Sequence, residues 1–486
     1  METQVTQSAF ELWPVLLGII NLLAAGGAAG HALMTKRDVR AAVAWLGVII
    51  LLPVFGWAVY LIFGINRIAR RAEELRAGDH ATGYLELPDE NRTTSAIATL
   101  TGETHLAQMA KIGRQIATIP YTLGNRITVL RNGDEAYPAM IAAIEGAQKS
   151  VVLSTYIFNN DAAGQLFLEA LKKAHARGIK VRVLIDGVGA WYSFPSMVKR
   201  LAKTDIPHAR FLHSFLPWQM PYLNLRNHQK ILVVDGKKGF TGSMNIAAGN
   251  LLANAPKHAV RDFHYAVQGP LVAHLMAAFA HEWRFSTGEI LVGDHWRPHL
   301  EEAGPVIARG LPAGPDMHRN TIRWTLLAAL SQARHQIRIV TPYFLPDTDL
   351  MTALSLAAMR GVVVDIVMPQ KNNLFYMAWA GRAQLDDLAA SGCRIWMSDG
   401  PFDHAKIMTV DGLWSLVGSA NWDPRSLRLN FEFNLECYDP SLAQELNAFI
   451  DDKIANATRE TAELLRARPL AVRLRDNLAR LMSPYL

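Results

Sequence analysis

Two copies of one pattern of reactive side chains stand out in this chain of 486 residues. Each copy has a histidine, a lysine two positions later, an aspartate five positions after the lysine, and a Gly-Ser-x-Asn ending. The copies comprise His228, Lys230, Asp235, Ser243 and Asn245, and His404, Lys406, Asp411, Ser419 and Asn421. Every member of the second copy lies 176 residues after its counterpart in the first. One register for both copies predicts an internal duplication that brings two identical sets of groups together.

These side chains, brought to one site, suit the exchange of a phosphodiester. Imidazole is a nucleophile that can also leave, so one histidine could carry the phosphoryl group between two displacements. The other histidine could protonate the leaving alkoxide and later deprotonate the incoming alcohol. The lysines could bind the nonbridging oxygens together with Asn245, Asn421, Ser243 and Ser419. We see no carboxylate cluster suited to two metal ions, so we expect neither a metal nor another cofactor.

The two aspartates of the pattern have an alternative interpretation. Asp235 and Asp411 each precede a glycine, and Asp-Gly pairs are typical of tight hairpin turns. They stay among the catalytic candidates because they belong to the repeated pattern, but we assign them no direct chemistry.

Similar elements precede each signature. The sequence predicts helices over residues 141–147, 162–177, 326–333 and 350–360, and strands over residues 150–156, 179–185, 337–343 and 362–368. Strand, helix and strand in this order, with short turns, predict an α/β layered domain with a largely parallel sheet. Each signature starts in an alternating segment, so its histidine and lysine share one face, and returns through a hairpin.

The N-terminal part is apolar enough to enter a membrane. Leu12–Thr35 and Ala41–Asn66 carry no formal charge, and each exceeds the ~20 residues that cross a bilayer as a helix. A signal peptide is the alternative for the first run. It fits poorly, because Glu2 and Glu11 precede the run and no basic residue does. We therefore expect a transmembrane hairpin of two helices.

The charges around the two runs favour a cytoplasmic large domain by a small margin. Three basic residues lie between the runs and four follow the second, within Arg67–Arg76. The two cysteines, Cys393 and Cys437, show neither zinc spacing nor a disulfide framework, which agrees with the cytosolic side. We expect a multi-pass protein of the bacterial inner membrane. The net charge of +6 would suit an anionic membrane surface and would suit nucleic acid as well.

We expect five segments along the chain. They are the hairpin (1–66), a charged helical exit over Arg67–Ala77 with a linker (67–123), a first repeat (124–300), a second repeat (301–455) and a basic amphipathic segment (456–486). In the last segment Leu470, Leu474, Leu478 and Leu481 fall on one helical face among arginines. This helix could lie on a membrane surface or pack on the body of the protein, and the sequence leaves both open.

The paired signatures resemble those of the phospholipase D superfamily, in which two His-Lys-Asp repeats build one active site. Other segments narrow the similarity to bacterial cardiolipin synthases: Leu51-Leu52-Pro53, Arg226-Asn227-His228, Thr341–Asp347 and Asn421–Glu432. The resemblance covers nearly the whole chain. It implies a duplicated phospholipase D-like domain of two α/β/α repeats. It also implies a membrane-bound transferase that joins two phosphatidylglycerol molecules and releases glycerol through a phosphatidyl-histidine, with phosphatidylethanolamine as an open alternative substrate.

The resemblance also implies roles for individual residues. An acid downstream of each signature should orient its histidine, which gives Glu432 for His404 and Asp262 for His228; each could instead be a surface acid. His228 should be the nucleophile and His404 the acid, although the symmetry of the repeats gives no physical reason for that choice.

Two apolar stretches beside the signatures could receive acyl chains. They are Phe211–Leu225 and Leu374–Trp379, and ordinary core packing is the alternative for each.

Two other classes of function compete with the transferase. A nuclease or hydrolase would use the same site, but a membrane hairpin favours a substrate that lies in the bilayer, and a nuclease would more often have a basic, aromatic-lined groove. A non-catalytic scaffold is disfavoured because histidine and lysine are intact in both copies. The expected partners are phospholipids and the bilayer, without nucleic acid, and the oligomeric state stays open.

Overall fold

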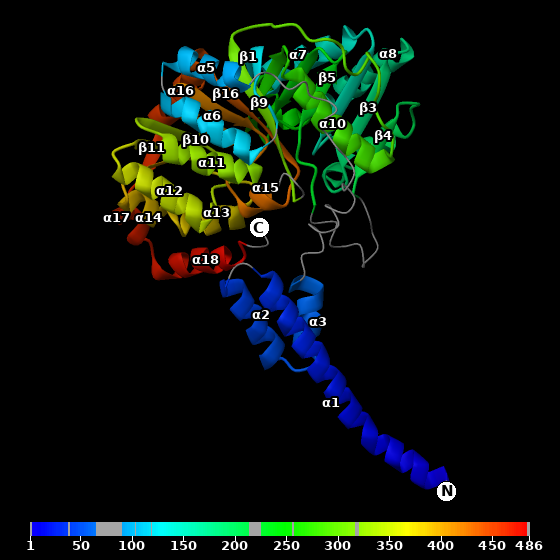
Figure 1. Cartoon of the computed structure of the whole chain (residues 1–486). Coiled ribbons are helices and arrows are strands. Elements are labelled where there is room, and N and C mark those ends of the chain that lie inside the picture. The colour runs from blue at the N-terminus through cyan, green and yellow to red at the C-terminus, as the bar shows by residue number, and fades with distance from the viewer. Residues whose placement is uncertain are drawn as a thin grey trace. The chain divides into compact units, whose positions relative to one another are not determined.

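The structure is a computed structural model that describes residues 2–36, 39–64, 90–102, 104–117, 119–212, 225–254, 257–315 and 320–483. Two compact units make up the chain, Met1–Arg71 and Ala72–Leu486, and each is described by itself as the N-terminal unit and the large unit (Figure 1). The charged helix expected over Arg67–Ala77 lies outside the described residues.

The N-terminal unit is built around one long apolar helix. Helix α1 covers Glu2–Thr35, and its part Trp13–Thr35 is long and apolar enough to cross a membrane. Helix α2 (Val39–Leu51) packs against α1, with Ala28, Ala32, Ile49 and Tyr60 buried between the helices. The two apolar runs therefore fold back on one another, as a hairpin requires.

The second apolar run is not one continuous helix, in contrast to the expectation for Ala41–Asn66. Helix α2 ends at Leu51, a short helix α3 covers Phe55–Val59, and a π-helical turn, η1, covers Tyr60–Gly64. The break contains Pro53, which has no backbone N–H to donate within a helix. At the break, the side chain of Asn21 accepts hydrogen bonds from the Val54 amide at 3.0 Å and the Trp57 indole at 2.9 Å.

The large unit contains a fifteen-stranded sheet that runs through both repeats. The first repeat supplies β1 (Thr122–Arg131), β2 (Ser150–Thr155), β3 (Lys180–Asp186), β4 (His208–Phe211), β5 (Ile231–Val234), β6 (Lys238–Gly242) and β8 (Phe263–Gln268). The second supplies β9 (Val306–Ala313), β10 (Gln336–Val340), β11 (Val363–Pro369), β12 (Arg394–Ser398), β14 (Ile407–Val410), β15 (Trp414–Gly418), β16 (Glu432–Tyr438) and β17 (Ala457–Glu460). Strands β1 and β9 pair and so join the repeats into one sheet.

The sheet is mixed, and the expectation of a largely parallel sheet is wrong. Only β2-β3-β4 and β10-β11-β12 pair in parallel within it. The remaining pairs are antiparallel, and they include the signature hairpins β5–β6 and β14–β15, which insert beside the parallel strands. Asp235 and Asp411 adopt positive φ angles of 53° in these turns, and the glycine after each is also at positive φ, as in a type I′ turn.

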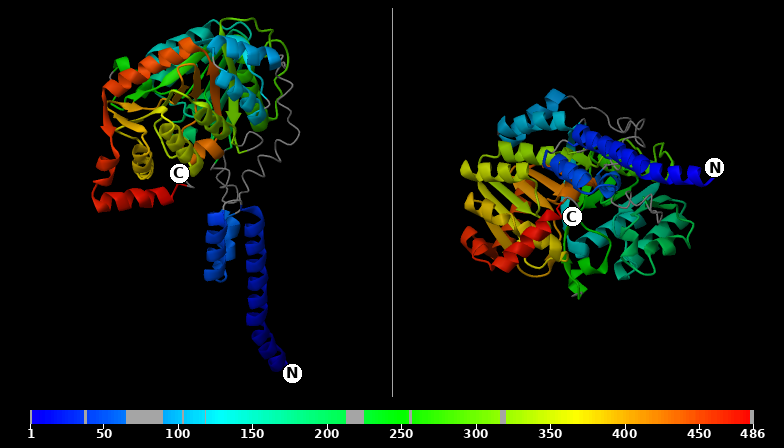
Figure 2. Two further views of the ribbon diagram at one scale, coloured as in Figure 1. Left: turned by 60° about the vertical axis from the view of Figure 1, so that its left-hand side comes forward. Right: turned by 90° about the horizontal axis from the view of Figure 1, so that it is seen from below.

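Helices cover both faces of the sheet (Figure 2). The first repeat carries α7 (Asn132–Glu145), α8 (Ala162–Ala176) and α10 (Val272–Thr287), and the second carries α11 (Thr321–Gln332), α12 (Thr348–Met359) and α16 (Pro440–Ala455). The predicted helices over 162–177 and 350–360 are confirmed as α8 and α12. The resulting layers are the α/β/α arrangement expected for each repeat.

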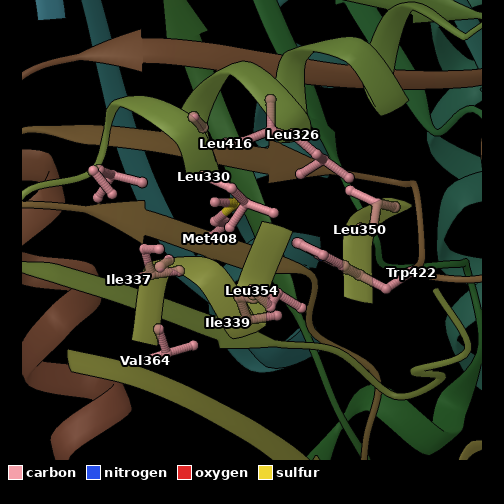
Figure 3. Close-up of a cluster of buried hydrophobic side chains, with 14 of the residues drawn as sticks. Leu326, Leu330, Ile337, Ile339, Leu350, Leu354, Val364, Met408, Leu416 and Trp422 are labelled. Carbon is pink, nitrogen blue, oxygen red and sulfur yellow. The ribbon is translucent and has the colours of Figure 1, made fainter. Parts of the chain in front are cut away.

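A continuous apolar core fixes the strands that carry the second signature. Leucines of α11 and α12 pack on Ile337, Ile339, Met408 and Leu416 of neighbouring strands (Figure 3). Burying each such side chain contributes about 1.5–3 kcal/mol. The strand that follows His404 and Lys406 is therefore held rigidly.

Part of the expected linker belongs to this core. Residues 90–116 form helices α5 (Glu90–Thr101) and α6 (Thr104–Ile116) instead of an unpatterned connection. Ile97, Leu106 and Met109 lie fully buried among the core residues of the second repeat. The large unit therefore begins its folded part well before residue 124.

Candidate active site

The two signatures meet at one cavity, as predicted. The cavity has a volume of about 1150 Å³, and its wall includes His228 and Asn245 from the first repeat and His404 and Asn421 from the second. Four groups of the two copies therefore face a common space that is large enough for a lipid head group and parts of its chains.

At the site, short backbone segments of the first repeat form hydrogen bonds with segments of the second repeat. A short strand β7 (Val260–Arg261) pairs in parallel with β13 (Phe402–Asp403), and the His404 amide donates to the Arg261 carbonyl at 2.8 Å. The matching bridge joins Asn227 to Phe431, and the His228 amide donates to the Phe431 carbonyl at 2.9 Å. Each histidine therefore lies beside the acid-bearing segment of the opposite repeat.

The orienting acids cross between the repeats, so the pairing expected within each repeat is wrong. His228 Nδ1 lies 2.8 Å from Glu432 Oε2, and His404 Nδ1 lies 2.9 Å from Asp262 Oδ2. Both acids are buried. A carboxylate at Nδ1 fixes the ring and leaves Nε2 for chemistry. Spacing along the chain assigned each acid to its own signature, whereas the backbone exchange places it on the other.

The two serines support these acids, which corrects their expected role at the phosphate. Ser243 Oγ donates to Asp262, and Ser419 Oγ donates to Glu432 at 2.5 Å. Asn430, which the sequence analysis did not identify, donates to the second oxygen of Glu432 at 3.0 Å. Both serines are buried, and neither is among the residues that line the cavity.

The two lysines are buried beside their own histidines. Lys230 Nζ donates to the His228 carbonyl and Lys406 Nζ to the His404 carbonyl, each at 2.6 Å. Burial lowers the pKa of Lys230 to about 7 and that of Lys406 to about 8. Their charge is therefore weakly solvated and favours an anion in the site.

Burial and the neighbouring lysines also keep the histidines neutral. Burial lowers the pKa of His228 well below its usual range and that of His404 to about 4, and Lys406 adds to both effects. A neutral imidazole is the nucleophilic form.

The two acids differ in their ionisation. Burial raises the pKa of Glu432 to about 7. Burial acts on Asp262 in the same direction, but His404, Lys406 and the Ser243 hydroxyl overcome it and hold the pKa of Asp262 at about 2. Asp262, the acid that contacts His404, is therefore more fully ionised at neutral pH than Glu432, the acid that contacts His228.

The signature aspartates are structural, so their inclusion among the catalytic candidates is corrected. Asp235 accepts hydrogen bonds from the amides of Gln148, Lys149 and Ser150. Asp411 accepts them from three equivalent amides, Arg334, His335 and Gln336, and lies 3.0 Å from His105 of α6. Each aspartate ties its hairpin turn to the start of the neighbouring strand, and neither lines the cavity.

Steric crowding explains why each signature has a glycine before its serine. Gly242 and Gly418 have φ angles of 151° and 155°. A Cβ on Gly242 would lie 2.7 Å from the Phe263 carbonyl oxygen, and one on Gly418 would lie 2.5 Å from that of Phe433. These glycines let the strand that ends each signature approach the strand that follows each acid.

Two tyrosines at the site were not identified from the sequence. The ring of Tyr156 lies 5.1 Å from that of His228, and the ring of Tyr343 lies 6.3 Å from that of His404. Both line the cavity. The sequence did contain a sign of their role, because each tyrosine is the last residue of one of the two equivalent buried strand segments, SVVLSTY and IRIVTPY.

One of the two apolar stretches reaches the cavity. Leu374, Tyr376 and Met377, at the start of helix α13 (Phe375–Arg382), line its wall. Residues 213–224 of the other stretch, Phe211–Leu225, lie outside the described residues. Four further cationic side chains line the cavity beyond the signatures: Arg226, Lys257, Lys371 and Arg425.

The comparisons with known proteins agree with this geometry. A family model described as "Cardiolipin synthase, PLD-like domain" matches residues 140–283 and 326–453, and a phospholipase D-nuclease N-terminal model matches residues 20–64. A cardiolipin synthase of Geobacillus kaustophilus is 30% identical over 97% of this chain and 94% of its own length. A cardiolipin synthase of Listeria monocytogenes is 29% identical over 97% of this chain and 99% of its own.

A solved structure shares the fold. The phosphatidylserine synthase of Haemophilus influenzae superposes with a TM-score of 0.59 at 17% identity, covering 78% of this chain and all of the other. The two matched segments of the PLD-like domain place this chain in the phospholipase D superfamily. Within it, this chain belongs to the cardiolipin synthase family with a phospholipase D-like domain.

Proposed function

We propose that this protein makes cardiolipin from two phosphatidylglycerol molecules and releases glycerol. The observation that supports this most strongly is the single cavity in which two histidines are each held by an acid of the other repeat, in a chain of the cardiolipin synthase family. Such a site can hold one phosphodiester and exchange the alcohol on it.

The first displacement transfers a phosphatidyl group to the protein. Nε2 of His228 attacks the phosphorus of the first lipid, and the bond from phosphorus to the glycerol oxygen breaks. His404, protonated when the anionic substrate binds, gives its proton to that oxygen. Asn245 and Asn421, which line the cavity, contact the nonbridging oxygens, and the charge of the signature lysines behind the cavity wall stabilises the charge that develops there.

The second displacement forms cardiolipin. His404, now neutral, takes the proton from a hydroxyl of the second phosphatidylglycerol, whose oxygen attacks the phosphorus. The bond from phosphorus to His228 breaks, and the neutral imidazole is restored. Over the two steps together one phosphate ester replaces another of similar energy, so the overall reaction is reversible.

The unequal acids support this assignment of the two histidines. Asp262 lies 2.9 Å from His404 and raises the pKa of that ring against the effect of burial, which favours the protonated form that a general acid needs. Glu432, whose pKa burial raises to about 7, is less fully ionised and therefore stabilises a protonated His228 less. The difference between the two acids distinguishes the two histidines, which the repeated sequence pattern does not.

The acceptor lipid brings a second phosphate that does not react. The signature groups serve the reacting phosphate, so other cations must face the second one. Arg226, Lys257, Lys371 and Arg425 line the same cavity, and Arg226 and Arg425 are close enough to repel one another, since burial and then Arg226 lower the pKa of Arg425. We assign the non-reacting phosphate to this basic side of the cavity.

The protein associates with a membrane, in agreement with its bacterial relatives and with helix α1. We propose that the second apolar run completes a multi-pass hairpin despite its break, and that the large unit faces the cytoplasm. Protease protection in sealed inverted vesicles tests this, because a large unit on the cytoplasmic side is digested and one on the other side is protected.

The decisive experiment is rapid quenching with radiolabelled phosphatidylglycerol, followed by peptide mapping. We expect label on His228 and none in His228→Ala, with both His228→Ala and His404→Ala inactive in cardiolipin formation. Label on His404 would reverse the roles. Half of the normal activity in either variant would contradict the single site, and a product that is all phosphatidic acid would identify a hydrolase.

A further inference from the structure

The C-terminal helix α18 (Leu470–Leu481) presents an apolar face to solvent. Leu470, Leu474, Leu478 and Leu481 are 69%, 61%, 67% and 73% exposed. They recur every three or four residues and therefore form one stripe. Met482, which follows the helix, is also exposed. A stripe of this kind is unfavourable in water and calls for an apolar neighbour.

The opposite, polar face of α18 attaches the helix to the large unit. Asp476 is fully buried and accepts hydrogen bonds from Arg468 and Arg475, each at 2.7 Å. The guanidinium of Arg475 lies 4.3 Å from the ring centre of Trp379 in α13. A surface helix ordinarily buries its apolar face, and here the arrangement is reversed. Of the two possibilities the sequence left open, packing on the body occurs, but through the polar side.

Exposed apolar side chains also occur on the neighbouring helix α13, which reaches the wall of the cavity. Helix α13 packs against α18 (Figure 1). At its start Phe375 is 60% exposed and lies 4.8 Å from Trp379 between ring centres. Its neighbour Tyr376 lines the cavity that contains both histidines. Helix α13 therefore contacts both α18 and the cavity in which the lipid would react.

Basic side chains accompany the stripe. Arg466 at the end of helix α17 (Ala462–Arg466), and Arg473 and Arg480 of α18, are exposed. An apolar stripe with arginines at its sides suits the surface of an anionic bilayer, where the leucines enter the acyl region and the guanidinium groups meet phosphates.

We propose that α18, together with the start of α13, docks the large unit on an anionic phospholipid bilayer with the cavity next to the lipid surface. A second protein would need a complementary acidic rim around an apolar groove, whereas an anionic bilayer supplies both features at once. The proposal rests on the proposed function to the extent that the substrate is a lipid of that bilayer. Docking lets a phosphatidylglycerol head group enter the cavity while its chains stay in the apolar phase.

A position-specific probe tests the docking in the full-length protein. Cys393 and Cys437 are buried, so a fluorophore attached to Leu478→Cys labels one surface site. The matched control is Leu166→Cys, an exposed leucine of α8 in the first repeat, far from α18 in Figure 1. In phosphatidylglycerol vesicles we expect the probe at position 478, and not that at position 166, to shift to the blue and to be quenched by lipid-borne nitroxides. A probe at position 478 that stays open to aqueous iodide overturns the proposal.

Activity measurements separate docking from catalysis. Leu474→Glu with Leu478→Glu should reduce turnover of phosphatidylglycerol in vesicles by about tenfold or more, since two buried leucines are lost from the bilayer. Turnover of a short-chain, dissolved phosphatidylglycerol should stay within about twofold, as for other surface substitutions. Leu166→Glu is the control. Equal losses on both substrates overturn the docking role. A wild-type protein that forms no cardiolipin from either substrate refutes the proposed function instead, and the probe result then stands separately.

Discussion

Replacing Asp262 with asparagine tests the crossed arrangement of the site most directly. The asparagine keeps the size of the side chain and removes the negative charge 2.9 Å from His404 Nδ1. Without that charge the buried ring of His404 loses the group that raises its pKa, which burial and Lys406 lower to about 4 even with Asp262 in place. We therefore expect the variant to lack its general acid in the first displacement and its oriented base in the second.

Removing a general acid typically costs about 10²–10⁴ in rate. At 1.36 kcal/mol per factor of ten, this corresponds to about 2.7–5.4 kcal/mol of transition-state stabilisation. A loss of less than tenfold would therefore be incompatible with the proposed role.

A substrate that needs no acid isolates the effect. A phosphatidyl ester of p-nitrophenol releases a weakly basic phenolate, so its first displacement needs only the nucleophile. With this substrate Asp262→Asn should give a burst of about one p-nitrophenolate per active site, followed by slow turnover, because the second displacement still needs a base. Stopped-flow absorbance measures both phases.

The control variant is Glu432→Gln, which changes the acid that holds His228. This variant should slow the first displacement with both leaving groups and show no burst. A burst from Glu432→Gln and none from Asp262→Asn would mean that the nucleophile is His404. Equal behaviour of the two variants would refute the assignment of one acid to each step.

Three further predictions follow from the same contacts. The value of kcat/KM should fall as the pH rises through about 7 to 8, because Lys230 and Lys406, whose pKa values burial lowers to about 7 and about 8, then lose the charge that binds phosphate; a pH–rate profile without this decline would contradict the role of the lysines. Saturating chelator should leave most of the activity, and added glycerol should convert cardiolipin back to phosphatidylglycerol; loss of activity that one specific metal restores would contradict a mechanism carried by two histidines. Arg309→Ala should lower the free energy of unfolding by about 3–5 kcal/mol, because it leaves Glu436 buried without its cation at 2.6 Å; in denaturant titrations Arg182→Ala, whose partner Glu289 is partly exposed, should cost about 0–1 kcal/mol.

The positions of the histidines could be predicted from the sequence because they depend on local periodicity. A residue pair such as His404 and Lys406 precedes a buried strand, and an Asp-Gly pair closes the hairpin. The strand–helix–strand units around α8 and α12 follow from the same kind of local pattern. The duplication of the signature then led to the prediction that both copies form one site.

The partners of the histidines could not be predicted in this way. The link between His404 and Asp262 depends on the pairing of Phe402 with Val260, two segments far apart in the chain. Nothing in the spacing distinguishes that pairing from one within a repeat. The roles of Ser243 and Ser419 were missed for the same reason, since only tertiary burial directs their hydroxyls to the acids.

Two other differences had a signal in the sequence. Pro53 lies inside the second apolar run, and a proline interrupts backbone hydrogen bonding in a helix. The break between α2 and α3 could therefore have been predicted from the position of this proline. The helices α5 and α6 were harder to predict, because few apolar residues mark their buried sides and these residues become core only against the second repeat.

The crossing of the acids explains why the two signatures form one unit of function. His228 without Glu432, or His404 without Asp262, is a buried imidazole that lacks its orienting carboxylate. Each acid comes from the other repeat, so neither repeat alone contains a complete histidine–acid pair. The two pairs differ in their acids and in the surroundings of each. One acid is a glutamate whose pKa burial raises, and the other is an aspartate whose pKa is lowered. In this way a nearly symmetric site can assign two different steps of one reaction to two identical side chains.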